Sequence, residues 1–311
     1  MKTQMNEYCP EGYRITTDTN KIYTQSLFGL QKAKLENKIL EATAVLCDLE
    51  HNLIVDFGFA KGLIPREEAA LGIKEGTVRD IAVISRVNHP VCFVVEQAEE
   101  SDDGGKPVII LSRAKAQELA WKNYINALVP GYITDAKITH LESFGAFADI
   151  GCGNIALMPI DCISVSRIEH PRERFTPGDR IRAVIKSVIN GRITLTHKEL
   201  LGTWEENAAD FFVGQTVPGI ARYVESYGTF IELTPNLSGL SEPSDGILSG
   251  QKVSVYIKSI IPEKMKIKLC VIETFEQRPK PQPFKYFIEN GIIEQMEYSP
   301  QSCAKKIVFK F

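Results

Sequence analysis

Two pairs of aromatic residues, each arranged around a glycine, have the residue types and spacing best suited to binding chemistry in this chain. One pair is Phe144 and Phe147, and the other is Tyr227 and Phe230. Both pairs lie in segments that repeat at an offset of 83 residues, and the same offset separates the only two tryptophans. Unpaired nucleic-acid bases stack on exposed rings of this kind. The pattern therefore predicts a stacking surface in each repeat.

Residues i and i+3 of a regular strand face opposite sides, so each pair can share one face only if the backbone bends between the rings. Gly145 and Gly228 allow that bend. Without the bend, one ring of each pair would belong to a core and the other would be an ordinary surface aromatic. Basic residues on the later predicted strands could reach the phosphates, although cations on strands are often only solvated edge charges. The candidate nucleic-acid contacts are Phe144, Phe147, Arg192, Lys186, Tyr227, Phe230, Lys258 and Lys266.

The densest basic cluster lies between Arg167 and Arg174, where Glu169 and Glu173 interleave with the arginines and His170. Neutralisation of phosphates from this connection is one interpretation of it. Alternating charges favour local ion pairing instead. The equivalent connection in the next repeat is eleven residues shorter, because the offset between matching segments falls from 83 to 72.

Composition indicates a globular chain with charge distributed unevenly along it. The 311 residues carry a net charge of −3, yet 37–113 sum to −5, 129–198 to +2 and 213–273 to 0. The middle segment is therefore the best candidate for phosphate contact. The N-terminus has no signal-peptide pattern and no apolar run is long enough for a membrane helix, so we expect a cytoplasmic protein. Seven scattered cysteines without a Cys-x-x-Cys pair are expected to be reduced.

No motif in the sequence indicates catalysis. The run from Gly151 to Ala156 matches a dinucleotide fingerprint by letter only, because a strand and not a helix is predicted after it, and a turn is the better interpretation. The five histidines are scattered, and no metal-ligand spacing or catalytic triad order is visible. We therefore expect no enzyme activity, no metal and no cofactor.

Short β-rich runs with turn signals predict an all-β fold of three tandem five-stranded barrels joined by short amphipathic helices. In the first barrel the predicted strands include Val78–Ser85, and 99–105 is a predicted solvated loop. Asn190-Gly191 predicts a tight hairpin in the second barrel, and 278–283 reads as a stiff polyproline linker. The predicted parts are an N-terminal helical extension 1–36, barrel one 37–113, linker helix 114–128, barrel two 129–198, linker helix 199–212, barrel three 213–273, and a C-terminal cap 274–311 with one helix and two strands.

At these residues the chain resembles the S-one family of RNA-binding repeats, an OB-fold type named after a large protein of the bacterial small ribosomal subunit. The resemblance covers roughly 37–273 and rests on Gly214, Tyr227-Gly228-Thr229-Phe230, Gly239-Leu240 and Arg192-Ile193-Thr194-Leu195-Thr196. The end of barrel one, Ile110–Ala116, is similar to the amino-terminal repeats of that family.

The resemblance implies binding of single-stranded RNA, including mRNA, by two aromatics, a histidine, an aspartate and an arginine in each repeat. Phe144, Phe147, Tyr227, Phe230, Arg192 and Lys266 match this pattern. Pro159 and Glu242 replace the histidine, and Val188 and Pro262 replace the aspartate. Barrel one lacks Phe-Gly-x-Phe, as do the ribosome-docking repeats, which implies contact with the small ribosomal subunit.

The chain is thus expected to bind RNA without catalysis, on or near the small ribosomal subunit. One alternative is a protein-interaction scaffold whose barrels have lost RNA binding, favoured by the acidic net charge. Another is an accessory RNA-binding factor in RNA decay.

Overall fold

The computed structural model describes residues 7–101, 105–189, 191–244, 246–276 and 283–311. Parts of the predicted loop 99–105, Asn190 of the predicted hairpin and nearly all of the predicted polyproline linker therefore lie outside the described residues. Contacts divide the chain into two compact units: Met1–Leu128 with Asp149–Ile155, and Val129–Ala148 with Ala156–Phe311. Each unit is described by itself.

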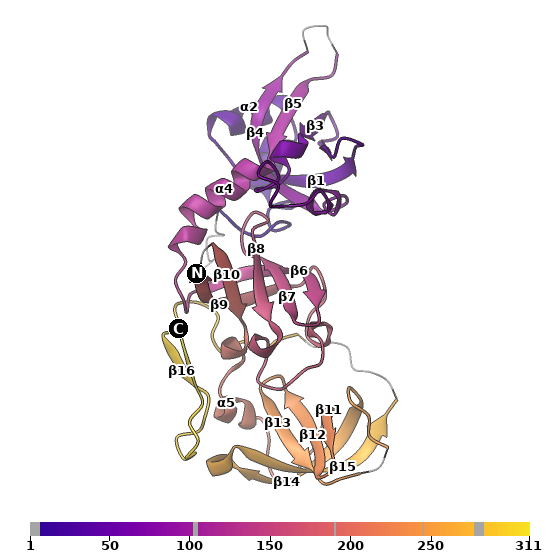
Figure 1. Cartoon of the computed structure of the whole chain (residues 1–311), viewed down its shortest axis with the longest axis vertical. Helices are drawn as coiled ribbons and strands as arrows, with labels where there is room; N and C mark the ends of the chain where they lie inside the picture. The colour runs from indigo at the N-terminus through magenta and orange to yellow at the C-terminus, as the bar shows by residue number, and fades with distance from the viewer. Residues whose placement is uncertain (1–6, 102–104, 190, 245, 277–282) are drawn as a thin grey trace. The chain divides into compact units, whose positions relative to one another are not determined.

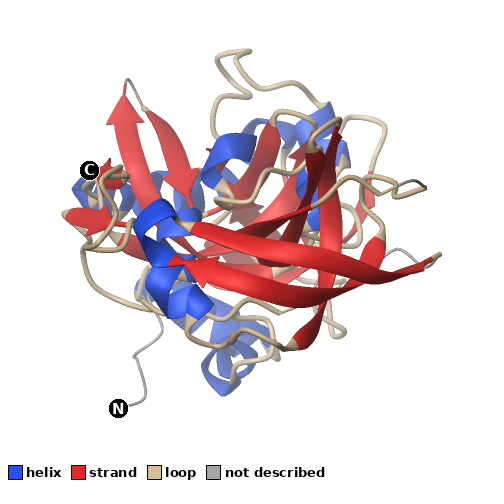
Figure 2. Ribbon diagram, turned by 90° about the horizontal axis from the view of Figure 1, so that it is seen from below, coloured by secondary structure: helices blue, strands red, loops and turns tan. Residues whose placement is uncertain are grey.

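Strands close into three five-stranded barrels (Figure 1), as the sequence predicts. The strands, red in Figure 2, make up most of the regular structure. Each barrel combines antiparallel pairs with one parallel pair, between its third and fifth strands. Apolar and polar residues alternate along the strands, so one row of side chains fills each barrel interior. Barrel one consists of β1 (Leu40–Cys47), β2 (Leu53–Asp56), β3 (Lys61–Ile64), β4 (Pro90–Glu99) and β5 (Val108–Ser112). Barrel two consists of β6 (Ile133–Glu142), β7 (Gly145–Asp149), β8 (Ile155–Pro159), β9 (Arg180–Ile189) and β10 (Arg192–Thr196). Barrel three consists of β11 (Thr216–Glu225), β12 (Gly228–Thr234), β13 (Leu237–Ser241), β14 (Lys252–Ile261) and β15 (Lys266–Phe275).

Helices flank the first barrel on the N-terminal side and after its last strand. The predicted N-terminal helix is α2 (Leu27–Leu35), and α1 (Asp18–Thr24) precedes it. The first linker begins with α4 (Arg113–Asn123), capped by the Ser112 side chain and followed by the 3₁₀-helix Ile125–Ala127. A further 3₁₀-helix, Arg66–Glu68, follows β3.

The prediction of a strand over Val78–Ser85 is wrong, because Ile81–Ile84 form the short helix α3. The amide of Ile84 donates to the carbonyl of Asp80, and that of Ser85 donates to Ile81. A short apolar run fits a strand or one helical turn equally well by periodicity. Here β3, whose Leu63 pairs with Ile110 of β5, already occupies that place in the barrel.

Charged side chains are buried in the first unit around Glu11. The Arg113 guanidinium binds both Glu11 carboxylate oxygens, at 2.7 and 3.0 Å. Although burial opposes ionisation, Arg113 holds the pKa of Glu11 below its ordinary value. Asp149 accepts the amide protons of Glu11, Gly151 and Gly153, and its burial, with Glu11 nearby, raises its pKa to about 7. These bonds shape a turn at the start of the run from Gly151 to Ala156, where the sequence predicts one.

The second linker connects barrels two and three within the second unit. It contains the 3₁₀-helix Lys198–Leu201 and α5 (Trp204–Ala208), whose first turn carries a capping box between Thr203 and Glu206. Trp204 is buried in the core of barrel three.

The C-terminal segment forms β16 (Gln295–Glu297) and β17 (Val308–Lys310), while the helix predicted for the C-terminal cap is absent from the described residues. The segment is extended because its aromatic residues anchor it at separate points. Phe284 and Tyr286 pack against His197, whose Nε2 lies 3.1 Å from the Tyr286 hydroxyl. Ile293 and Met296 pack with Ile133, Val184 and Leu200. The C-terminal cap therefore packs on barrel two in addition to barrel three, for which the cap was predicted.

Protonation of His197 should destabilise the second unit. Burial disfavours the imidazolium and lowers the pKa of His197 to about 4, from 6.5 in an exposed histidine. The unfolded chain thus binds more protons between these values, so this contribution to stability is complete above pH 6.5 and is lost as the pH falls to 4. The loss is on the order of 3 kcal/mol.

Urea unfolding at pH 7, 5.5 and 4.5, followed by Trp204 fluorescence in a Trp121→Phe background, measures this effect. The unfolding free energy of His197→Gln should depend less on pH than that of the matched parent. Equal pH dependence of the two proteins would show that His197 titrates normally.

Candidate nucleic-acid interface

The ring pair of barrel two lies where β6 passes into β7. Phe144 precedes β7 and is 55% exposed, whereas Phe147 on β7 is half-buried. Their ring centroids are 6.0 Å apart at an interplanar angle of 89°, so the rings are edge to face. A Cβ on Gly145 would lie 2.5 Å from the Met158 carbonyl oxygen. Glycine thus permits the close approach of backbones that brings the two rings together.

Barrel three repeats this arrangement between β11 and β12. Tyr227 is 59% exposed, Phe230 is half-buried, and their centroids are 6.3 Å apart at 88°. Gly228 has a φ of 147°, and a Cβ there would collide with the Ser241 carbonyl oxygen. Both rings of each pair therefore contact one another on one outer face.

A further ring accompanies each pair, and sequence reasoning missed both. The His140 ring lies 6.2 Å from Phe147, and its Nε2 is 2.6 Å from the Glu142 carboxylate. In barrel three Tyr223 is opposite Phe230 in the register of β11 and β12. His140 and Tyr223 are separated by the same 83 residues as the ring pairs, so the repeat itself could have identified them.

Tyr223 and Phe230 begin a row of outward-facing side chains that crosses barrel three. Phe230 is opposite Leu240 on β13, and Leu240 is opposite Lys268 on β15. The exposed Lys268 thus belongs to a row that starts with aromatic rings and continues to Ser259 on β14. In barrel two, Leu157 is opposite Thr194, which has no charge. Lys268 follows the candidate Lys266 at the strand period of two, which is the signal that could have identified it.

The predicted basic residues differ in exposure and in the groups they contact. Arg192 and Lys266 are exposed at the starts of β10 and β15, in equivalent positions. Lys186 on β9 is also exposed and lies 3.0 Å from the Cys162 sulfur.

Lys258 is already paired with a carboxylate of the same face. Its Nζ lies 2.9 Å from Glu242, and this hydrogen bond lowers the pKa of Glu242, with the charge of Lys268 adding to the effect. Glu242 follows β13 directly and is 79% exposed at its side chain. A carboxylate thus opposes anion binding beside the ring pair of barrel three.

The prediction of local ion pairing in the Arg167–Arg174 connection is wrong for Glu173 and Arg174, because both pair with barrel three. Arg174 is buried and lies 2.5 Å from Glu232 on β12. Arg222 on β11 binds Glu232 at 2.8 Å and also pairs with Glu173. We call Glu173, Arg174, Arg222 and Glu232 the buried ion network.

Neither a metal-ligating cluster nor a membrane-spanning helix is present in the described part of the chain. No group of three or more histidine, cysteine, aspartate or glutamate side chains there could hold a metal ion. None of the helices within the described ranges is long and apolar enough to span a membrane.

Residues 129–198, which contain barrel two, match the family described as S1 RNA binding domain, so the predicted resemblance is confirmed. The chain is also similar to the small ribosomal subunit protein bS1 of Leuconostoc lactis, with 29% identity over 73% of this chain and 54% of that protein. Its Staphylococcus aureus (strain COL) counterpart is 26% identical over 87% of this chain and 72% of that protein. The chain thus spans about half the length of the first of these relatives.

A crystal structure of a multidomain protein with nucleic acid binding domains from Streptococcus pneumoniae aligns with 77% of this chain and 75% of its own. The identity is 15% and the TM-score is 0.25. At this TM-score the likeness adds nothing to the argument.

Gly228→Ala should destabilise the chain more than Gly214→Ala. Both glycines have positive φ, which costs other residues about 1–3 kcal/mol. A Cβ at Gly214 meets only the Tyr256 hydroxyl at 3.9 Å, whereas one at Gly228 also collides with backbone. Urea unfolding of both variants measures the difference, and equal losses would show that the close approach at Gly228 is unimportant.

Proposed function

We propose that this protein binds single-stranded RNA, without catalysis, through the outer faces of barrels two and three. The observation that carries the proposal is the recurrence of one geometry. The exposed ring pair of barrel two lies within residues that match the S1 RNA binding domain, and barrel three carries the same edge-to-face pair. Two such faces on one chain suit a strand long enough to contact both.

Stacking supplies the main attraction in this proposal, and cations direct the strand. An exposed ring contributes about 1–3 kcal/mol for each stacked base. The candidate cations Arg192, Lys186, Lys266 and Lys258, together with Lys268, would contact the phosphates. Lys258 requires displacement from Glu242 before it can do so fully.

We further propose that the protein acts in translation, in the cytoplasm, with mRNA as its ligand and the small ribosomal subunit as its partner. Support comes from the relatives, which are small ribosomal subunit proteins. Barrel one would contact the ribosome, because it lacks the ring pair and its segment 37–113 carries a net charge of −5. Its exposed Leu46 and Leu49, around the β1–β2 connection, suit contact with protein better than contact with RNA.

Removing either ring pair should weaken RNA binding. We expect Phe144→Ala/Phe147→Ala and Tyr227→Ala/Phe230→Ala each to raise the Kd about tenfold or more, because each variant loses a stacked base. Fluorescence anisotropy of a short unstructured RNA at low and moderate salt measures the change. Phe212→Ala, which removes an exposed ring outside both faces, is the matched control.

Wild-type protein that fails to bind this RNA at low salt would overturn the proposal and favour the protein scaffold. Ring variants that bind as tightly as wild type would also contradict it. Binding that weakens with salt is expected, since each phosphate contact releases counterions.

Glu242→Gln should strengthen RNA binding. The substitution removes the charge that pairs with Lys258 while keeping a side chain of similar shape. Because Lys258 is then free to contact phosphate and the opposing carboxylate is gone, the Kd should fall about two- to fivefold. The same anisotropy titration tests this, with Glu205→Gln on α5 as a control for net charge. An equal gain in the control would assign the effect to overall charge.

A further inference from the structure

We infer that Arg167, supplied by the connection between β8 and β9 of barrel two, is a phosphate-binding residue of the RNA face of barrel three. The inference rests on the proposed function. It makes this face a composite site within the second unit, with one ligand-binding side chain from the preceding repeat. The pattern of site residues that the sequence resemblance implies contains no such residue.

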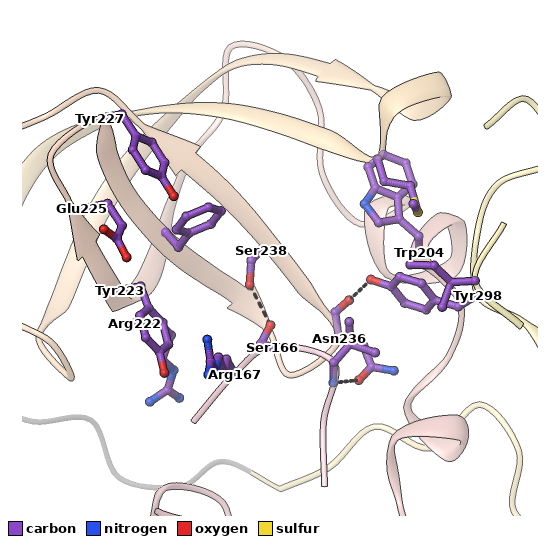
Figure 3. A pocket seen from close by; sticks show the side chains of 14 residues that line it. Ser166, Arg167, Trp204, Arg222, Tyr223, Glu225, Tyr227, Asn236, Ser238 and Tyr298 are labelled. Carbon is purple, nitrogen blue, oxygen red and sulfur yellow. Dashed lines mark hydrogen bonds between the residues drawn. The ribbon is translucent and has the colours of Figure 1, made fainter. Parts of the chain in front are cut away.

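Arg167 lies over an aromatic ring of barrel three. Its guanidinium carbon lies 5.1 Å from the centroid of the Tyr223 ring (Figure 3). Tyr223 in turn is opposite Phe230, the half-buried ring of the pair. Planar guanidinium groups commonly pack on rings in this way and keep their donors available for phosphate oxygens. Arg167 thus lies beside the aromatic end of the row that also contains Lys268.

Arg167 differs from the nearby arginines in its ion pairing. Its neighbours Arg174 and Arg222 are buried and paired with the carboxylates of the buried ion network. Arg167 is exposed, and within the described residues no carboxylate pairs with it. A cation that is held in place on a ring and lacks a counterion is suited to bind an anion.

Arg167 also lines a groove on barrel three. A groove of about 450 Å³ is lined by Arg167, Tyr223, Tyr227, Phe230 and Glu225, among others (Figure 3). The groove therefore continues from the ring pair to the guanidinium. Glu225 disfavours an anion near itself, so the phosphate belongs at Arg167. A strand stacked on Tyr227 and Phe230 can pass along this groove.

The position of Arg167 is also fixed by its surroundings. The preceding Ser166 bonds to Ser238 of β13, with 2.7 Å between hydroxyl oxygens, and its amide donates to the Pro235 carbonyl. The amide of Val165 donates to the buried Asn236 side chain. These contacts attach the connection to barrel three immediately before Arg167. The longer connection of barrel two therefore places Arg167 on barrel three within the second unit.

The test compares Arg167→Ala with Arg172→Ala in the full chain. Both remove one positive charge from the same connection, but the Arg172 guanidinium contacts the His170 ring and does not line the groove. Anisotropy titrations of a short unstructured RNA at several salt concentrations give the Kd and its salt dependence. Arg167→Ala should raise the Kd about tenfold and reduce the slope of log K against log salt by about 0.7, the loss of one phosphate contact. Arg172→Ala should leave both nearly unchanged, and Arg167→Lys should restore the slope.

Equal effects of Arg167→Ala and Arg172→Ala would overturn the inference, because they would show a general effect of charge. So would an unchanged slope in Arg167→Ala. The ring variants separate this failure from failure of the proposed function. If wild-type binding depends on Tyr227 and Phe230 but not on Arg167, the proposed function stands and the composite site does not. If the wild type binds no RNA, both fail.

Discussion

A buried carboxylate held between two arginines from different parts of the second unit is the interaction on which its arrangement depends. Glu232 is bound by Arg222 of its own barrel and by Arg174 of the β8–β9 connection. Removing three charges from water is costly, and the cost is recovered only where each charge keeps its partner in good geometry. A displaced connection would leave Glu232 half-paired. The ion network therefore specifies how the connection lies on barrel three more than it adds net stability.

This constraint makes the two ring faces unequal, although the sequence repeats them closely. Barrel three has a row that contains Lys268 and begins with aromatic rings, and Arg167 lies over the Tyr223 ring at that beginning. The equivalent row of barrel two includes Thr194 in place of the lysine, and its histidine is bound to Glu142. Net charge ranks the barrels in the opposite order, at +2 for 129–198 and 0 for 213–273. The sum counts Arg174 and Arg167 for barrel two, yet the first is neutralised by barrel three and the second lies on its face.

Features encoded within one repeat were predictable from the sequence. The 83-residue offset and the alternation of apolar residues predicted three barrels, and the glycines predicted the bends that bring each ring pair together. Predictions of secondary structure were wrong where the sequence of a short segment was compatible with two conformations. Ile81–Ile84 is apolar enough for a strand or a helical turn, and the barrel already had its third strand. The C-terminal cap was expected to contain a helix, but the anchoring sites of its aromatic residues, such as His197 for Tyr286, hold the segment extended.

Contacts between repeats were not predictable from the sequence. Aligning the repeats identifies equivalent residues, but it does not show which residues of one repeat contact another. Arg174 and Glu232 are 58 residues apart, an interval that matches neither the offset of 83 nor that of 72. What the sequence does reveal is where the repeats differ in length. An extra eleven residues cost chain entropy unless they make contacts that order them. Here they supply two members of the ion network and the arginine above Tyr223. In a chain of similar barrels, the departures from the repeat therefore indicate where one barrel contacts the next.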